Sequence, residues 1–339
     1  MNERGLVGGL VVVALAVLTC GATGFDLATW NVEGNGEADP DTVAQIMSTI
    51  DVDLWGLCGV RAEGWVETFE AVLDQIPGRD YEAVLGNTGG PNLRILALYD
   101  TNVFEFVEAR EVSWVYRSWY SPELAPREPL YVHLRHKETG YEFLFLVCQL
   151  YRGDGVDPRR LDQAQGLAET VMRWGLPTIA VGDFNFDWDL DANQTADNYN
   201  KGFGHMTSLS VFSWVVPQRL VKTHDSFCNC ILDFVFVANA AGKLTITSDI
   251  IVREGDFPDT SATADHRPVR AEVVWYTPYL QPHQVESYPC DCAGADLNCS
   301  DFATHEDAQA CSEHCKGLGY GDVFCLDGDE DGNACESLP

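Results

Sequence analysis

The sequence predicts an α+β fold in which two β-sheets are sandwiched between layers of helices, followed by a small cysteine-rich module. Strand-like and helix-like segments alternate near the start of the 339-residue chain, and many strands with few helices follow. The last fifty residues differ from the rest in charge and cysteine content. The hydrophobic fraction of 46% and the aromatic fraction of 11% are typical of a folded protein.

The N-terminus has the pattern of a secretory signal peptide. An apolar run over residues 7–18, interrupted only by glycines, is more typical of a signal peptide than of a membrane span. Small residues favour cleavage after Ala22 or Gly24. We therefore expect a signal peptide over residues 1–24 and a secreted or cell-surface protein. Lipid attachment at Cys20 is the alternative, but a threonine before it fits that signal poorly. No other segment of the sequence is apolar and long enough to span a bilayer.

The main domain is expected over residues 25–276. Its first strand, 25–32, precedes a helix with Asp39 as its N-cap and Pro40 in its first turn. A second strand and helix follow at 53–60 and 65–76. The remaining strands are expected at 81–85, 94–99, 103–115, 130–135, 143–150, 177–181, 231–237, 244–252 and 269–275, with one helix at 159–174. This excess of strands over helices favours two sheets covered by helical layers.

Acidic residues dominate the chain. There are 52 acidic and 21 basic residues, for a formal net charge of −31, and residues 290–339 hold twelve acids and a single lysine. Such acidity argues against gripping nucleic acid by a broad basic patch. The acidity does not exclude a single cleft in which a cation and a few arginines bind a phosphoester. A proline-containing linker over 277–295 is expected to separate the main domain from this acidic module.

Polar side chains occur at four predicted strand ends. An acid beside a histidine can hold a tautomer or bind a cation while the imidazole moves a proton, and an acid within an apolar strand is costly without a partner. Each motif alone also occurs as an ordinary turn, but four of them in one domain indicate a common site. The motifs are Trp30-Asn31, Gly182-Asp183-Phe184-Asn185, Leu232-Asp233 and Asp265-His266.

Taken in order, these motifs resemble the endonuclease/exonuclease/phosphatase superfamily, which includes DNase I-like nucleases, inositol-phosphate phosphatases and sphingomyelinases. The resemblance covers roughly residues 25–276. It implies a four-layer αββα sandwich that hydrolyses a phosphoester by in-line attack of water, with Mg²⁺ or Mn²⁺ as cofactor. The resemblance implies that His266 is the general base and that Asp233 supports this histidine. It implies that Asp183 and Asn185 position the nucleophile and the phosphate, and that Asn31 and Asp265 bind the metal.

Two positions depart from the family pattern. The second strand normally ends in a metal-binding glutamate, and here that position is Gly59. The central strand normally carries a catalytic histidine, and here it carries Gln149, which can donate a hydrogen bond to phosphate but cannot become charged. Glu33 or Glu63 could supply a replacement carboxylate, although solvation is the ordinary fate of such residues.

Two hypotheses follow. The first is a secreted metal-dependent phosphoester hydrolase, a nuclease or phosphodiesterase, that acts as a monomer on a phosphoester substrate, with nucleic acid as one candidate. The second is a catalytically impaired protein of the same fold that acts as an extracellular binding protein. The candidate phosphate contacts are Arg94 and a cluster of Arg152, Arg159 and Arg160, because a guanidinium donates two parallel hydrogen bonds. Arg159 and Arg160 open a helix, so surface ion pairs explain them equally well.

Twelve cysteines favour disulfides and an oxidising compartment. This expectation includes Cys58 and Cys148, at the two altered strand ends, and Cys228 with Cys230. The sequence does not fix the pairing. A zinc site formed by these four cysteines of the main domain is the alternative, but they include only one short Cys-X-Cys pair, Cys228 and Cys230.

The C-terminal module has an acidic loop whose oxygen atoms could wrap a hard cation. An EF-hand loop would need glutamate at its twelfth position, which here is Leu338. Residues 296–304 together with the loop and Cys335-Glu336 instead resemble the Excalibur extracellular calcium-binding domain, over about 296–337. The resemblance implies a disulfide between Cys299 and Cys335. The Ca²⁺ ligands it implies are Asp327, Asp329, Asp331 and Glu336.

Overall fold

The structure is a computed structural model. The residues that it describes are 23–33, 38–61, 63–112, 127–152, 158–191, 201–208, 210–225, 229–254, 264–275, 298–299, 302, 304–317, 326 and 333–335. The body of the expected signal peptide, the linker and the expected calcium ligands lie outside this set; those ligands are Asp327, Asp329, Asp331 and Glu336.

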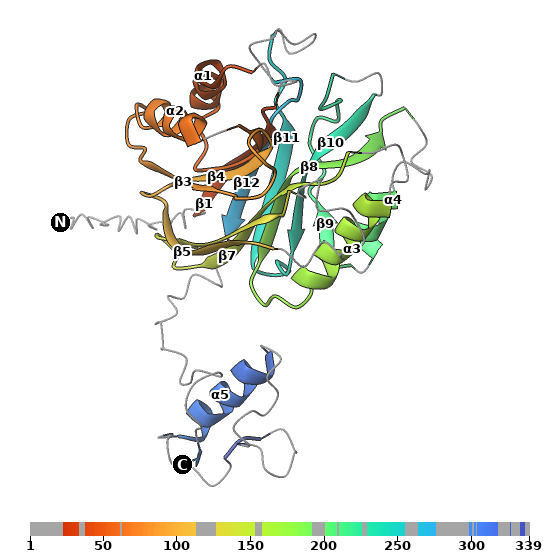
Figure 1. Cartoon of the computed structure of the whole chain (residues 1–339). Helices are drawn as coiled ribbons and strands as arrows, with labels where there is room; N and C mark the ends of the chain where they lie inside the picture. Colours follow the sequence, from red (N-terminus) through yellow and green to blue (C-terminus); the bar gives the residue numbers. More distant parts are fainter. Residues whose placement is uncertain are drawn as a thin grey trace, which may run out of the picture.

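Two six-stranded sheets form the main domain (Figure 1). The first has the order β11-β12-β1-β2-β4-β3 and the second β5-β6-β7-β8-β10-β9. The strands of the first sheet are β1 (Gly24–Asn31), β2 (Leu54–Val60), β3 (Tyr81–Leu85), β4 (Arg94–Asp100), β11 (Leu244–Ile250) and β12 (Val269–Trp275). Those of the second are β5 (Phe104–Glu111), β6 (Leu130–His136), β7 (Glu142–Gln149), β8 (Thr178–Asp189), β9 (Phe212–Trp214) and β10 (Cys230–Ala238).

Helices cover the outer faces of both sheets. On the first sheet lie α1 (Pro40–Ile50) and α2 (Glu63–Leu73), and on the second lie α3 (Pro158–Val171) and α4 (Lys201–Ser208) (Figure 1). The start of α1 is as predicted, because the Asp39 side chain accepts a hydrogen bond from the Thr42 N–H at 3.0 Å. The order helix, sheet, sheet, helix confirms the predicted α+β sandwich.

Two parallel strand pairs, one in each sheet, decide where polar groups meet. β1 runs parallel to β2, with Asn31 opposite Cys58, and β7 runs parallel to β8, with Gln149 opposite Asp183. The other strand pairs in these two sheets are antiparallel. Because parallel neighbours end at the same edge of a sheet, each pair brings two side chains to one end of the sandwich.

β8 differs from its prediction. The sequence places Gly182-Asp183-Phe184-Asn185 after a strand that ends at residue 181, whereas β8 continues through these residues to Asp189. The strand continues because the alternate side chains Phe184 and Phe186 are fully buried against aromatic residues of β10. Local bends replace the expected turn, with φ of 134° at Gly182 and 51° at Asn185.

The predicted disulfides at Cys58 and Cys148 are wrong, because both cysteines are free and buried. The Cys58 thiol donates to the Cys148 carbonyl at 3.2 Å, and burial raises the pKa of both thiols. They act as small apolar side chains between the two sheets. Three elements were not predicted: α4 and β9 in the main domain and the helix α5 (His305–Gly317) in the C-terminal module. α4 is short and contains two glycines, which disfavour helix formation.

The C-terminal module contains α5 (His305–Gly317) and a disulfide between Cys299 and Cys335, the pair that the Excalibur resemblance implies. A small hydrophobic core surrounds the helix; its buried residues are Phe302, Ala308, Cys311, Cys315, Leu326, Ala334 and Cys335. Over the whole set of described residues, no helix is both long and apolar enough to cross a membrane.

Candidate active site

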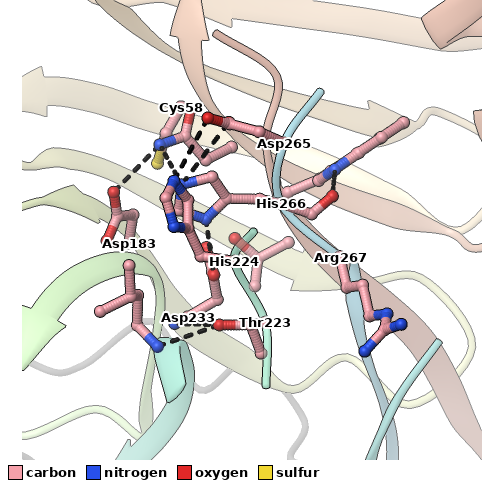
Figure 2. A network of polar contacts seen from close by, with 12 residues as sticks. Cys58, Asp183, Thr223, His224, Asp233, Asp265, His266 and Arg267 are labelled. Carbon is pink, nitrogen blue, oxygen red and sulfur yellow. Dashed lines mark hydrogen bonds and ion pairs between the residues drawn. The ribbon is translucent and has the colours of Figure 1, made fainter. Parts of the chain in front are cut away.

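A buried pair of histidine and carboxylate forms the centre of the site (Figure 2). His266 is 5% exposed, and its Nδ1 lies 2.7 Å from Asp233 Oδ2. The Asp233 backbone N–H donates to Thr223 Oγ1 at 3.3 Å, and Trp30 Nε1 donates to the His266 carbonyl at 2.8 Å. These contacts fix both partners. With Nδ1 held by a carboxylate, Nε2 is the nitrogen that remains for chemistry.

The end of β1 and the middle of β8 reach the same point. Asn31 Nδ2 donates to Asp183 Oδ2 at 3.0 Å and lies 3.4 Å from His266 Nε2. Asp183 Oδ1 accepts a hydrogen bond from the Asn185 backbone N–H at 3.1 Å, while the Asn185 side chain donates to the Leu150 carbonyl at 3.1 Å. Asn185 therefore fixes two groups: its backbone N–H holds the Asp183 carboxylate, and its side chain holds the chain just after β7. The sandwich thus joins strand residues that are more than 150 residues apart in the sequence.

Buried carboxylates set the electrostatics of this cluster. Burial raises the pKa of Asp183. Burial alone would lower the pKa of His266, but Asp233, Asp183 and Asp265 outweigh it and raise the value to about 9. The imidazole is therefore protonated at neutral pH as long as these carboxylates carry their full charge.

Of the predicted site residues, the structure brings together Asn31, Asp183, Asp233, Asp265 and His266. Gln149 is 3% exposed at the end of β7, opposite Asp183. Within the described part of the chain, the predicted phosphate contacts Arg94 and Arg152 are not hydrogen-bonded to the five residues of this cluster. Arg94 donates to the Gly90 carbonyl at 3.3 Å, and Arg152 is exposed.

The two arginines that open α3 are not both surface groups. Arg160 is 1% exposed and lies 3.6 Å from Asp187, so its interpretation as a surface ion pair is wrong. Arg159 lies over the Tyr151 ring, 3.4 Å from its centroid.

His224 belongs to the site and was missed by sequence reasoning. It is 6% exposed, its Nε2 lies 3.2 Å from Asp265 Oδ2, and its ring meets that of His266 edge-on with centroids 4.5 Å apart (Figure 2). It comes from the irregular segment before β10. No sequence pattern marks it, because a lone histidine in a polar segment is usually a surface residue.

The donor set fits a divalent cation. Asp183 and Asp265 contribute carboxylates to the cluster beside His266. Two buried oxygens, Asp233 Oδ1 and Gln149 Oε1, have no hydrogen-bond partner among the described residues. Unpartnered buried acceptors of this kind are satisfied by a cation or by water. Asn31 Oδ1 already accepts a hydrogen bond from the Glu33 N–H at 3.1 Å. The Glu63 side chain lies outside the described residues.

Gly59 has a backbone and surroundings that require glycine. Its φ is 75°, and a Cβ atom there would lie 2.7 Å from Glu33 Cβ and 2.8 Å from Asn31 Oδ1. Any side chain at this position would collide with Glu33 and Asn31. The Cβ atom of Glu33 therefore lies next to the place that a Cβ atom of residue 59 would take.

Replacing Gly59 with alanine should lower the free energy of unfolding by about 2–4 kcal/mol, from a left-handed φ plus overpacking. Denaturant unfolding would measure this. The control is Gly78→Ala, which has φ 87° but no atom within 4 Å of the new Cβ, so it should cost only about 1–2 kcal/mol. Equal losses in both variants would show that the contacts with Asn31 and Glu33 do not matter.

Solved structures of other proteins share this fold. A mannosyl-6-phosphatase from Bacteroides thetaiotaomicron is 22% identical, with a TM-score of 0.55 over 74% of this chain and 99% of its own. An endonuclease/exonuclease/phosphatase family protein of the same organism is also 22% identical, with a TM-score of 0.56 over 76% and 99%. The human Nocturnin catalytic domain, solved with a bound sulfate, is 16% identical, with a TM-score of 0.54 over 75% and 94%.

No protein-family model matches the chain, and no curated protein sequence does. At these identities the structural likeness establishes the fold of the main domain, the one that the strand-end motifs imply. Any reaction that the protein catalyses depends on the residues of the site and not on the fold.

Proposed function

We propose that this protein is a secreted, metal-dependent phosphoester hydrolase in which His266 is the general base. The observation that carries the proposal is the 2.7 Å contact between His266 Nδ1 and Asp233 in a buried cluster with Asn31 and Asp183. A buried imidazole oriented by a carboxylate is a common arrangement for activating water. The names of the structural neighbours, which include a mannosyl-6-phosphatase, agree with this reaction class.

In the proposed reaction, His266 Nε2 accepts a proton from the attacking water while Asp233 holds Nδ1–H and stabilises the imidazolium that forms. Asn31, 3.4 Å from Nε2, is placed to donate a hydrogen bond to a phosphate oxygen. A divalent cation, when bound, would stabilise negative charge on the phosphate and the leaving oxygen. Asp183 and Asp265 would hold it, with Asn31 and Glu33 nearby.

The same carboxylates link proton transfer to cation binding. His266 has a pKa of about 9 because Asp233, Asp183 and Asp265 surround it. When Asp183 and Asp265 share their charge with a cation, the pKa of His266 falls and the neutral imidazole becomes available near neutral pH. Each group in this scheme comes from one chain, so we propose that the protein acts as a monomer.

An activity screen of the full chain tests the proposal. The substrates are a bis-aryl phosphodiester, an aryl phosphomonoester, a sugar 6-phosphate and plasmid DNA, each with Mg²⁺, Mn²⁺ or Ca²⁺ and with EDTA. We expect turnover of at least one of them that EDTA abolishes. If no substrate is turned over with any cation, the alternative of an extracellular binding protein of the same fold is favoured instead.

We propose further that the C-terminal module binds Ca²⁺. The Cys299–Cys335 disulfide and the small core around α5 support a folded module, and its proposed ligands include Asp329 and Asp331. In calorimetry on the full chain, alanine at both aspartates should lower Ca²⁺ affinity by about 100-fold. Unchanged Ca²⁺ binding by this double variant would defeat the assignment.

Secretion is also part of the proposal, since the apolar N-terminal run and a disulfide outside the main domain agree with export. Expression of the full precursor should yield a protein in the medium whose N-terminus lies near residue 25. Retention on the membrane with a lipid at Cys20 would support the alternative.

A further inference from the structure

We propose that His224, Asp265 and His266 form a binding site for a transition metal ion of the Zn²⁺ class. His224 Nε2 lies 3.2 Å from Asp265 Oδ2, and His266 Nε2 lies 4.0 Å from Asp265 Oδ1. The ligand atoms of the three residues all lie within 4.8 Å of one another (Figure 2). This places two imidazoles and a carboxylate around one point.

The backbone holds the two histidines on one side. Residues 224 and 266 are directly opposite in an antiparallel bridge. The Asp225 N–H donates to the Asp265 carbonyl at 2.9 Å, and the Arg267 N–H donates to the Thr223 carbonyl at 2.7 Å. These flanking bonds make the histidines a non-hydrogen-bonded pair, the arrangement in which opposite side chains come closest. The two rings are therefore placed together by main-chain geometry and not by a chance rotamer.

The surroundings of the His266 ring are those of a metal ligand. The Nδ1 of a metal-bound histidine usually meets a carboxylate, as His266 Nδ1 meets Asp233 at 2.7 Å. His224 has an unpartnered polar atom, Nδ1, in a side chain that is more than nine-tenths buried. A buried imidazole nitrogen without a partner is costly, so His224 Nδ1 requires a bound water. His224 Nε2 is the nitrogen that faces Asp265 and would bind the ion.

The donor types select the ion. Two imidazole nitrogens and one carboxylate oxygen, with a position open for water, are typical of zinc sites and suit Co²⁺ as well. Mg²⁺ prefers oxygen ligands and keeps much of its water. Zn–N and Zn–O distances near 2 Å require ligand atoms roughly 3.3 Å apart, so the three donors would close by about 1.5 Å or less.

Occupation of this site would change the proposed reaction. A metal on His266 Nε2 takes the lone pair that would accept the proton from water, and it takes Asp265 from the catalytic cation. Zn²⁺ should therefore inhibit hydrolysis that Mg²⁺ supports. This consequence rests on the proposed function, whereas the binding itself does not.

Titration of the metal-free full chain with Co²⁺ tests the site, since Co²⁺ bound by nitrogen and oxygen ligands absorbs visible light. We expect absorption bands that saturate with Co²⁺, disappear on addition of Zn²⁺ and persist in a roughly 100-fold excess of Mg²⁺. His224→Ala should weaken Co²⁺ binding by roughly 100-fold or more. Asp265→Asn is a second variant that should also weaken it, and thermal unfolding would confirm that both variants are folded.

The control is His133→Ala. His133 also pairs with a carboxylate, Glu142, at 2.9 Å, but on β6 and β7, so Co²⁺ binding should not change. Absent bands, or bands that His224→Ala and Asp265→Asn leave unaltered, would overturn the proposed site. If Co²⁺ binds as expected but the protein turns over no substrate, the proposed metal site is supported and the proposed hydrolase function is overturned.

Discussion

Replacing His266 with alanine should reduce kcat for the proposed hydrolase by about 10³-fold or more, with a smaller effect on KM. General base catalysis contributes about 10²–10⁴-fold in enzymes. The expected loss is toward the upper end, because the variant also leaves Asp233 buried and uncompensated, 2.7 Å from the missing Nδ1. Steady-state kinetics on the best substrate of the activity screen, at saturating Mg²⁺ or Mn²⁺, would measure it.

Two further variants separate catalysis from folding. Asp233→Asn keeps the shape of the pair but removes the charge that holds the imidazolium, so it should cost about 10²-fold in kcat. His133→Ala removes another histidine bonded to a carboxylate and should leave kcat unchanged. Loss of activity by His133→Ala, or full activity of a folded His266→Ala protein, would contradict the assignment of His266 as the base.

The layered fold and most of the site could be predicted because they depend on local patterns. Apolar strands that stop at polar residues are visible in the sequence, and the parallel pairs β1–β2 and β7–β8 then bring their ends together. Asn31, at the end of β1, was found in this way, and Asp183 and His266 were found from polar motifs beside predicted apolar strands. The N-cap of α1 likewise rests on neighbouring residues.

What could not be predicted depends on contacts between distant segments. His224 joins the site through an antiparallel bridge to His266, and nothing around it in the sequence signals that pairing. Cys58 and Cys148 are free and buried inside the sandwich, and the Cys58 thiol is hydrogen-bonded to the Cys148 carbonyl, which no cysteine count reveals. The length of β8 was misjudged because glycine and asparagine usually end a strand, whereas the burial of Phe184 and Phe186 continues it.

The departure at Gly59 also has a different meaning once the structure is known. From the sequence, a glycine in place of glutamate suggests only a lost ligand. In the structure a side chain there would collide with Glu33 Cβ and Asn31 Oδ1. The variant Gly59→Glu is therefore a poor test of activity, because the new side chain would displace Asn31 from the His266 cluster. Variants of His266 and Asp233 address the chemistry directly.

Replacing Gly182 with alanine should be the most damaging small substitution in the main domain, with a loss of more than about 4 kcal/mol in the free energy of unfolding. Gly182 lies in β8 opposite Cys148 of β7, with φ 134°, and a Cβ there would be 1.9 Å from the Cys148 carbonyl oxygen. That oxygen is backbone in the middle of a sheet, so it cannot move aside without breaking the parallel pair that carries Gln149 and Asp183.

Gly140→Ala separates the two causes of this loss. Gly140 also has a positive φ, 71°, but a Cβ there would meet no atom within 4 Å, so the substitution should cost only about 1–2 kcal/mol. If Gly182→Ala cost no more than Gly140→Ala in denaturant unfolding, the close packing of β7 on β8 would not be what requires glycine before Asp183. If the cost is large, the glycine of the Gly-Asp-Phe-Asn motif is explained by the sheet: it lets two parallel backbones approach closely enough to place Asp183 beside Asn31 and His266.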